Sequence, residues 1–228
     1  MRSAGTFWDH RCLRKKVESK SREAVANLLN LFFTQTDKIE LWKTALRIER
    51  CGDRGVVRRL IAALDDENPY RRHAAARALG WIDNAGPSAA KALIAALLDP
   101  SQPQPVREEA AESLAYSRYK EAIPPLISVL AEPDVRMRFW AVFAIGSIAY
   151  SRAKRGGDRR VVVEALELML SDEEMPPGNW WPVGREALAM LGKLDPRYKE
   201  MLAVEIARVR SNPDSPPHDL RWANFYGR

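Results

Sequence analysis

Two neighbouring segments of this sequence carry side chains that could bind a ligand or a partner. They are the carboxylates of Glu108, Glu109 and Glu112 and the rings of Phe139, Trp140 and Phe143. Residues three and four positions apart share one face of a helix, so each set would form a cluster on its own helix. Carboxylates select basic or amide-bearing groups, and exposed rings supply apolar burial at contact sites. The two segments therefore predict a binding surface that is both acidic and aromatic.

The sequence has none of the local motifs by which metal sites and common catalytic centres are recognised. The three histidines, His10, His73 and His218, are dispersed, and neither Cys12 nor Cys51 has a partner at zinc-ligand spacing. The glycine motif of phosphate-binding loops and the serine motif of hydrolases are both missing. We therefore expect no metal, no cofactor and no enzymatic activity.

Composition predicts a globular protein that stays in the cytoplasm. The chain has 228 residues, of which 46% are hydrophobic, enough to bury a continuous core. The longest apolar run, 92–98, is too short to cross a bilayer, and two cysteines fit a reducing compartment. The net charge of +6 comes mainly from basic runs near the start of the chain and at 151–160. We expect no contact with a membrane.

An internal repeat predicts the elements that position these side chains. Arg72, Arg107 and Arg138 each begin a segment in which small or apolar residues recur at fixed offsets. Three positions on stand Ala75, Ala110 and Ala141, and eight positions on stand Gly80, Ala115 and Gly146. These offsets form one buried stripe of a helix, and such small residues indicate close approach between helices. A second amphipathic segment and an acidic or proline-rich turn precede each copy, so the repeating unit is a helical hairpin.

The segment LIAALDDENPYRRHAAARALG at 60–80 fits the pattern LxxxLxDxxxxxRxxAAxALG. Through this pattern the chain resembles HEAT repeats, in the short form of phycobilisome lyase subunits and many bacterial scaffold proteins. The resemblance implies an all-α fold, a right-handed α-solenoid of about five HEAT-like helical hairpins with irregular end caps. We expect the solenoid to form one domain at 22–210, after a basic, partly disordered lead-in at 1–21 and before a C-terminal tail at 211–228.

The resemblance also implies a structural ladder of ion pairs between neighbouring units. In such repeats an acidic residue at the turn is followed six positions later by a basic residue. Asp66 with Arg72 and Glu132 with Arg138 have this spacing, whereas Ser101 precedes Arg107. The expected ladder residues are Asp66, Arg72, Arg107, Glu132 and Arg138.

The exposed positions of the inner helices would line a concave groove, the usual binding surface of stacked repeats. The expected groove residues are Arg77, Trp81, Glu108, Glu109, Glu112, Tyr116, Phe139, Trp140 and Phe143. The favoured hypothesis is a non-catalytic scaffold that binds a peptide or a partner helix of another protein in this groove. An alternative is internal packing, in which the insertion at 173–184 folds over the aromatic rings with Trp180 and Trp181.

Two other functions remain open. A nucleic-acid-binding protein of the DNA alkylation-repair glycosylase type would use the basic edges at 11–20 and 151–160. The groove carboxylates argue against this function because they repel phosphates. A bilin lyase-like chromophore handler, which the family resemblance suggests, would hold a tetrapyrrole among the groove aromatics. Glu108 and Glu109 would then bind its pyrrole nitrogens.

Overall fold

The structure is a computed structural model that describes residues 22–50, 54–82, 85–153, 159–178 and 181–227. Every regular element in these ranges is helical. The first six helices are α1 (Arg22–Thr34), α2 (Lys38–Ile48), α3 (Arg54–Ala62), α4 (Pro69–Trp81), α5 (Pro87–Leu98) and α6 (Gln104–Ser117). The others are α7 (Ile123–Ser128), α8 (Val135–Ala153), α9 (Arg160–Leu168), α10 (Val183–Leu194), α11 (Pro196–Ser211) and α12 (Pro217–Tyr226). Short 3-10 turns are η2 (Ala63–Asp65), η3 (Lys120–Ala122) and η4 (Val129–Ala131).

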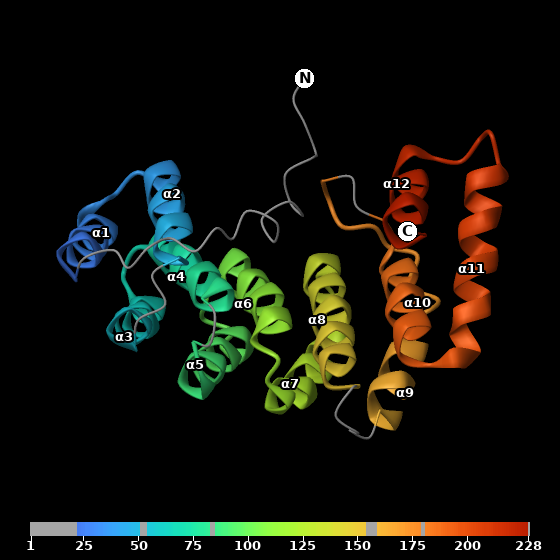
Figure 1. Ribbon diagram of the computed structural model, residues 1–228, viewed down its shortest axis with the longest axis horizontal. Coiled ribbons are helices and arrows are strands. Elements are labelled where there is room, and N and C mark those ends of the chain that lie inside the picture. The colour runs from blue at the N-terminus through green and yellow to red at the C-terminus, as the bar shows by residue number, and fades with distance from the viewer. Residues whose placement is uncertain (1–21, 51–53, 83–84, 154–158, 179–180, 228) are drawn as a thin grey trace.

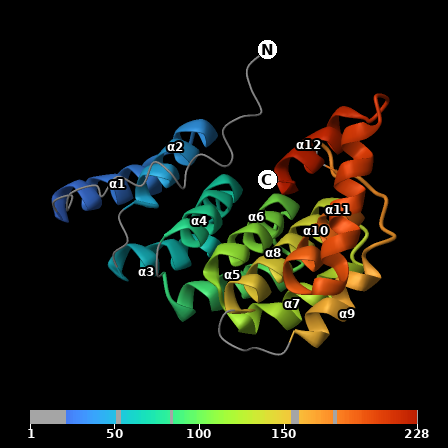
Figure 2. The same ribbon diagram turned by 45° about the vertical axis from the view of Figure 1, so that its right-hand side comes forward.

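Consecutive helices pair as hairpins that stack from α1 and α2 at one end to α11 and α12 at the other (Figure 1). Helices α2, α4, α6, α8 and α10 pack against one another in an inner row, and α3, α5, α7 and α9 form an outer row. The turned view in Figure 2 shows the same two layers. The expected all-α solenoid is confirmed.

The C-terminal end differs from the expected count of hairpins. The segment 211–228, expected as a tail, contains α12, which packs on α11 and completes a sixth hairpin within the described residues. A helix as short as α12 is not stable by itself in water. Packing stabilises it, since Trp222 is fully buried. None of the described helices has the length and apolar character that a membrane span requires.

Polar caps fix where the helices begin. The Asn68 side chain accepts a hydrogen bond from the Tyr70 N–H at 2.9 Å, at the first turn of α4. The Asp195 side chain accepts one from the Arg197 N–H at 2.9 Å, at the first turn of α11. Such caps satisfy N–H groups that have no partner inside the helix. The polar turns of the repeat therefore set the start of these helices.

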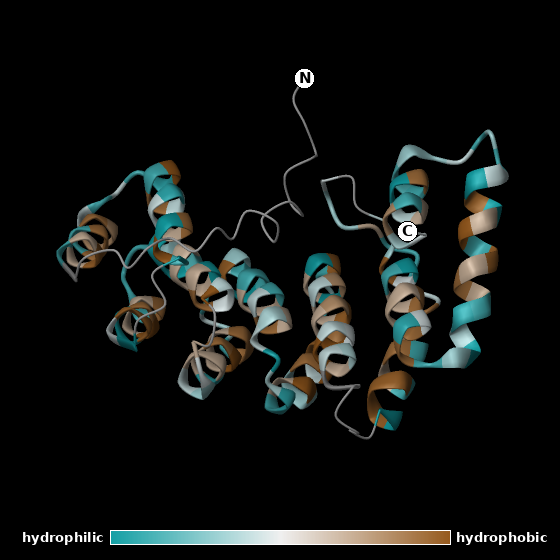
Figure 3. Cartoon of the chain, viewed as in Figure 1, coloured by the Kyte–Doolittle hydropathy of each residue, from teal (hydrophilic) through white to brown (hydrophobic). Residues whose placement is uncertain are grey.

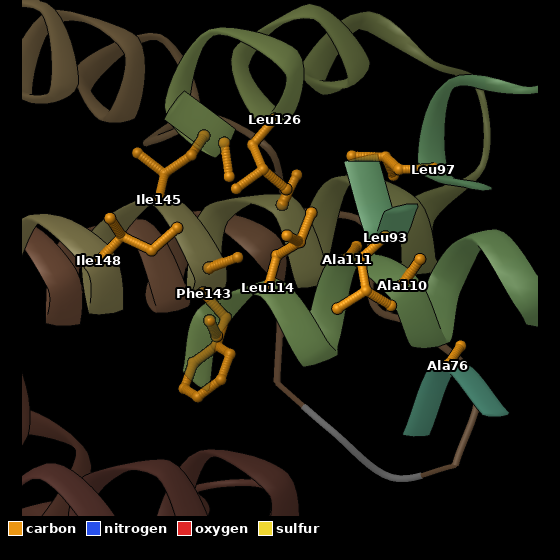
Figure 4. Close-up of a cluster of buried hydrophobic side chains, with 14 of the residues drawn as sticks. Ala76, Leu93, Leu97, Ala110, Ala111, Leu114, Leu126, Phe143, Ile145 and Ile148 are labelled. Atoms are coloured by element: carbon orange, nitrogen blue, oxygen red, sulfur yellow. The ribbon is translucent and has the colours of Figure 1, made fainter. Parts of the chain in front are cut away.

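The core lies between the two rows. Hydrophobic and hydrophilic residues alternate along each helix, as expected for helices with one buried side (Figure 3). Leu93 of α5, Leu114 of α6, Leu126 of α7 and Ile145 of α8 are almost completely buried and join successive hairpins (Figure 4). Full burial of one such side chain contributes about 1.5–3 kcal/mol.

The inner helices approach one another closely at glycine. A Cβ atom at Gly80 of α4 would lie 2.3 Å from the Cβ of Ser113 in α6. A Cβ atom at Gly146 of α8 would lie 2.3 Å from the Cγ of Met190 in α10. The close approach predicted from the small-residue columns is confirmed, since these glycines leave room for the Ser113 and Met190 side chains to lie directly against the helix backbone.

The first ion pair of the expected ladder uses a different arginine. Nη1 of Arg71 lies 2.7 Å from Oδ1 of Asp66, and Arg71 also donates to the main-chain oxygens of Phe32 and Gln35. The expected pair of Asp66 with Arg72 is not formed. The reason is that Arg71 reaches both Asp66, in the turn of its own hairpin, and the main-chain oxygens of the preceding hairpin.

Arg107 and Arg138 each reach the turn between the two helices of the following hairpin. Arg107 donates to Glu132 Oε2 at 3.0 Å, and Arg138 donates to Asp172 Oδ2 at 2.7 Å. Arg138 meets Glu132 only through the main-chain oxygen of that residue, at 2.9 Å. These pairs bridge neighbouring units because a guanidinium on an inner helix reaches the turn that follows it. Spacing along one unit therefore identified Arg107 and Arg138 but not their carboxylate partners, and it named Arg72 in place of Arg71.

Candidate functional site

Side chains from α2, α4 and α6 meet around the guanidinium of Arg77. The Arg77 carbon Cζ lies 5.0 Å from the ring centre of Trp42 and 4.5 Å from that of Trp81, so the cation sits against two indoles. Arg77 and Trp81 are one turn apart on α4 and share a face. We define the Arg77 cluster as Trp42, Glu49, His73, Arg77, Trp81, Glu109 and Glu112.

Three carboxylates face this one guanidinium. Arg77 Nε lies 3.4 Å from Glu49 Oε1, and Arg77 Nη1 lies 3.9 Å from Glu109 Oε1 and 3.8 Å from Glu112 Oε1. The last two separations exceed hydrogen-bonding distance. His73 Nε2 lies 3.3 Å from Glu109 Oε2. When all three carboxylates are ionised, negative charge exceeds the charge of Arg77.

Burial shifts two of these carboxylates toward the protonated form. Desolvation raises the pKa of Glu49 to about 7, against the attraction of Arg77. Desolvation, with the nearby charge of Glu109, raises the pKa of Glu112 to about 8. Glu112 therefore holds a proton at neutral pH, because a buried carboxylate beside a like charge is unfavourable.

Five polar atoms of the cluster are buried and have no hydrogen-bond partner in the described part of the chain. They are Oε1 of Glu49, Glu109 and Glu112, Nε of Arg77 and Nε1 of Trp81. Each such atom costs about 1–3 kcal/mol, so native folds rarely leave several together. Atoms of this kind around one point are typical of a site that binds something else.

Aromatic rings continue from the cluster along the inner row. The ring centres of Trp81 and Tyr116 are 4.4 Å apart, and those of Tyr116 and Phe143 are 6.2 Å apart. Trp140 follows at 5.9 Å from Phe143 and 5.4 Å from Phe139. Trp81, Tyr116 and Trp140 are half-buried. The row therefore presents ring edges or faces from three helices, α4, α6 and α8.

Several groove residues are less exposed than the repeat pattern predicted. The three glutamates Glu108, Glu109 and Glu112 are 8%, 6% and 5% exposed. The small-residue columns bring the inner helices so close that flanking positions are covered as well. The carboxylates thus lie deeper than an acidic wall on a groove surface would.

The insertion covers part of the aromatic set. Phe139 and Phe143 are buried, and the Trp181 ring centre lies 6.2 Å from that of Phe139. Internal packing, the alternative to an exposed patch, therefore describes these two phenylalanines, whereas Trp140 remains half-buried. Trp180 lies outside the described residues.

A second buried carboxylate lies at the C-terminal end of the inner row. Glu186 is 1% exposed and accepts hydrogen bonds from Trp181 Nε1 at 2.6 Å and from the Tyr226 hydroxyl at 2.7 Å. Burial raises the pKa of Glu186, which these two hydrogen bonds oppose. Sequence reasoning missed this arrangement, although Glu186 occupies the repeat column of Glu109, two positions behind the arginine column.

The basic edges expected from the sequence lie largely outside the described residues. The basic run at 11–20 lies outside the described residues, as do 154–158 of the second run. Within the described ranges no group of three or more histidine, cysteine, aspartate or glutamate side chains could hold a metal ion.

The stacked helical hairpins define an α-solenoid protein, and comparison with known sequences gives the same class. The family description "HEAT repeats" matches residues 25–115 and 90–176, so the chain belongs to the HEAT-repeat family. The bilin biosynthesis protein PecE of Nostoc sp. (strain PCC 7120) is 32% identical over 196 residues, covering 73% of this chain and 72% of PecE.

Solved structures show the same likeness. A chain in the complex of CpcE and CpcF of phycocyanin lyase from Nostoc sp. PCC7120 has a TM-score of 0.59 and 25% identity, over 89% of this chain and 73% of that chain. An engineered protein has a TM-score of 0.52 and 21% identity, over 88% of this chain and 94% of that one, and shares the fold alone.

These relatives contradict the expectation that the chain is not an enzyme. One is a bilin biosynthesis protein and another belongs to a phycocyanin lyase. The expectation relied on missing local motifs, but a solenoid assembles its sites from residues of different repeats. Such sites leave no compact signature in a sequence.

Proposed function

We propose that this chain is a subunit of a bilin lyase-type enzyme that holds an open-chain tetrapyrrole against the inner row. The observation that carries this proposal is the Arg77 cluster, with its unpaired buried polar atoms beside half-buried rings. The likeness to PecE and to the CpcE–CpcF complex supports the same class of ligand.

The chemistry of a bilin matches the chemistry of the cluster. A bilin presents flat conjugated rings, which stack on aromatic side chains such as Trp81 and Tyr116. It also presents pyrrole N–H donors, for which the free oxygens of Glu109 and Glu112 are acceptors. Arg77 stays in place as an internal counter-ion between two indoles.

The proposed contact surface keeps most of the residues expected from the sequence. Those that would touch the ligand are Arg77, Trp81, Glu108, Glu109, Glu112, Tyr116 and Trp140. Phe139 and Phe143 would support the half-buried rings from the core side. Carboxylates at the centre of this surface oppose the binding of nucleic acid, whose affinity rests on phosphate neutralisation.

We also propose that the chain works together with a second protein. CpcE of phycocyanin lyase forms a complex with CpcF, which supports a protein partner for this chain. The partner would be a protein, whereas the groove that the sequence analysis assigned to a peptide or helix would hold the pigment.

Titration with biliverdin, an open-chain tetrapyrrole, tests the ligand class. Binding to the full chain, alone and with a co-expressed second lyase subunit, should change the visible absorbance of the pigment. Trp81→Ala should weaken binding about tenfold, because a stacked ring contributes about 1 kcal/mol beyond its buried area. Tyr150→Ala, which removes an exposed ring of α8 outside the cluster, is the matched control and should bind normally.

Two results would count against the proposal. One is an unchanged absorbance with wild type in both settings. The other is equal affinity for wild type and Trp81→Ala, which would place any bound pigment elsewhere.

A further inference from the structure

We propose that Glu112 is the proton donor of this site and transfers its proton to the imine-type ring nitrogen of the bound tetrapyrrole. The resulting cation pairs with the carboxylates of Glu109 and Glu112. This inference rests on the proposed function and adds to it the protonation state in which the ligand is held.

The first argument is the position of Glu112. It lies one turn before Tyr116 on α6, as Arg77 lies one turn before Trp81 on α4, so each charged group shares a face with a ring. The rings of Trp81 and Tyr116 contact each other at 4.4 Å between centres. A planar ligand stacked on this ring pair would have its nitrogens within reach of the Glu112 carboxyl group.

The second argument is the balance of charge. With Glu112 protonated, Arg77 faces one neutral acid, the carboxylate of Glu109, and Glu49, whose pKa of about 7 leaves it partly protonated at neutral pH. The cation formed on the ligand offsets the negative charge that Glu112 gains when it loses its proton. The N–H groups of the ligand would also satisfy the Oε1 atoms that have no partner in the described chain.

The groups that face Glu112 come from three elements. Arg77 on α4 and Glu109 on the same helix, α6, act on Glu112 directly, whereas Glu49 at the end of α2 contacts Arg77 and His73 on α4 contacts Glu109. From α8, Arg136 lies 3.5 Å from Glu108 and is engaged there. Among these, Glu112 combines deep burial with a proton that it holds at neutral pH, since its pKa is about 8.

The transfer is balanced without any co-reactant. The O–H bond of the Glu112 carboxyl group breaks, and an N–H bond forms on the ligand. The electron pair of the broken bond remains on Glu112, which becomes a carboxylate. Protonation turns the imine-type nitrogen from an acceptor into a donor, so every ring nitrogen then donates toward the carboxylates.

Proton uptake during binding gives the first test. Biliverdin is added to weakly buffered wild-type protein at about pH 7, and a pH indicator follows the protons exchanged with water. An internal donor predicts a red-shifted, protonated pigment with no net uptake of protons. Uptake of one proton for each bound pigment would overturn the proposal, because the proton would then come from solvent.

The variant Glu112→Gln gives the second test. It keeps the shape of the neutral acid but cannot lose a proton, so bound pigment should show the unshifted absorbance of the neutral form. Wild-type affinity should fall about tenfold per pH unit above the Glu112 pKa of about 8, and this dependence should vanish in the variant.

The matched control is Glu186→Gln, which removes a different buried carboxyl group of the inner row. It should retain the red shift and the pH dependence, and circular dichroism checks that both variants fold. If Glu112→Gln also retains them, the proposal is wrong while bilin binding stands. If wild type binds no biliverdin, both this inference and the proposed function fail.

Discussion

The two ends of the inner row use one repeat column in opposite ways. Glu109 and Glu186 both stand two positions behind the arginine column. Glu186 is closed off by its own chain, since Trp181 and Tyr226 donate hydrogen bonds to its two oxygens. Glu109 and its neighbour Glu112 each keep an oxygen without a hydrogen-bond partner in the described residues. The Glu186 site is therefore satisfied by the fold itself, whereas the Glu109 and Glu112 site, which we call the open site, keeps buried oxygens that the described residues do not pair.

This difference shows that the repeat places a carboxylate at equivalent positions of the inner helices. The irregular segments then determine whether that carboxylate receives hydrogen bonds. The insertion before α10 and the helix α12 provide the donors that close the Glu186 site. Helices α4 and α6 lie in the regular part of the stack, where neighbouring repeats supply no such donors to Glu112. Irregular ends of a solenoid are usually explained as caps. Here they also supply the donors that distinguish Glu186 from the carboxylates proposed to bind the ligand.

The largest expected effect comes from deleting each carboxylate in turn. Glu186→Ala should lower the free energy of unfolding by about 3–5 kcal/mol, because two buried donors lose their acceptor and a cavity remains. Glu112→Ala should cost about 1 kcal/mol or less, since its carboxyl group makes no short bond and lies near Glu109. Urea denaturation of both variants measures the difference. Equal losses would remove the distinction between the two sites.

The pH dependence of the free energy of unfolding should come mainly from Glu112 at the open site. The pKa of Glu112 rises from 4.5 to about 8 on folding, so the folded state binds more protons between these values. Stability should therefore fall as pH rises between these two values, at up to about 1.4 kcal/mol per pH unit, and should level off outside them. Thermal unfolding of wild type and Glu112→Gln across this range checks it. A variant with the wild-type slope would assign the dependence to other carboxylates.

Removing a single hydrogen bond at the Glu186 site should have an intermediate effect on the free energy of unfolding. Tyr226→Phe removes the hydroxyl group that donates to Glu186 Oε1 at 2.7 Å and keeps the ring. The expected loss is about 1–2 kcal/mol, since the acceptor is a buried carboxyl group. Urea denaturation measures it, with Tyr150→Phe at an exposed position of α8 as control. An unchanged stability would mean that Glu186 does not depend on α12.

The smallest effect is expected at the surface beside the open site. Arg136→Ala removes a partly exposed guanidinium that lies 3.5 Å from Glu108. Solvent screening keeps such pairs weak, so the change in the free energy of unfolding should stay below about 0.5 kcal/mol. A thermal melt beside wild type is sufficient to see this. A loss comparable to that of Tyr226→Phe would show that Glu108 belongs to the buried network.

The fold was predictable because its signal repeats along the chain. Small residues in register behind Arg72, Arg107 and Arg138 predicted stacked hairpins, and the structure has them. Helix α12 was not predicted because it has no copy elsewhere in the sequence. Its place depends on the burial of Trp222 against α10, where its indole donates to the main-chain oxygen of Arg185 at 3.1 Å.

The candidate site was predictable only in part. The columns identified Arg77, Trp81, Glu109 and Glu112, but Trp42 and Glu49 lie in a first copy too degenerate to align. Spacing also could not give the depth of the carboxylates, which depends on how closely α4 and α6 approach. The family resemblance did suggest a bilin lyase-like alternative, which the relatives support, but the expectation of no enzymatic activity was wrong because no local motif records contacts between repeats.

The contact between Gly80 and Ser113 has a consequence for how such a protein changes over generations. The backbone of Gly80 lies directly against the Ser113 side chain, and neither residue belongs to the variable columns of the repeat, which hold the groove residues. Mutations in those columns can replace an acid by a ring, or a ring by a base, without displacing the neighbouring units. Ligand preference and architecture can thus be inherited separately, so a lineage can acquire a new pigment or partner while its skeleton stays the same.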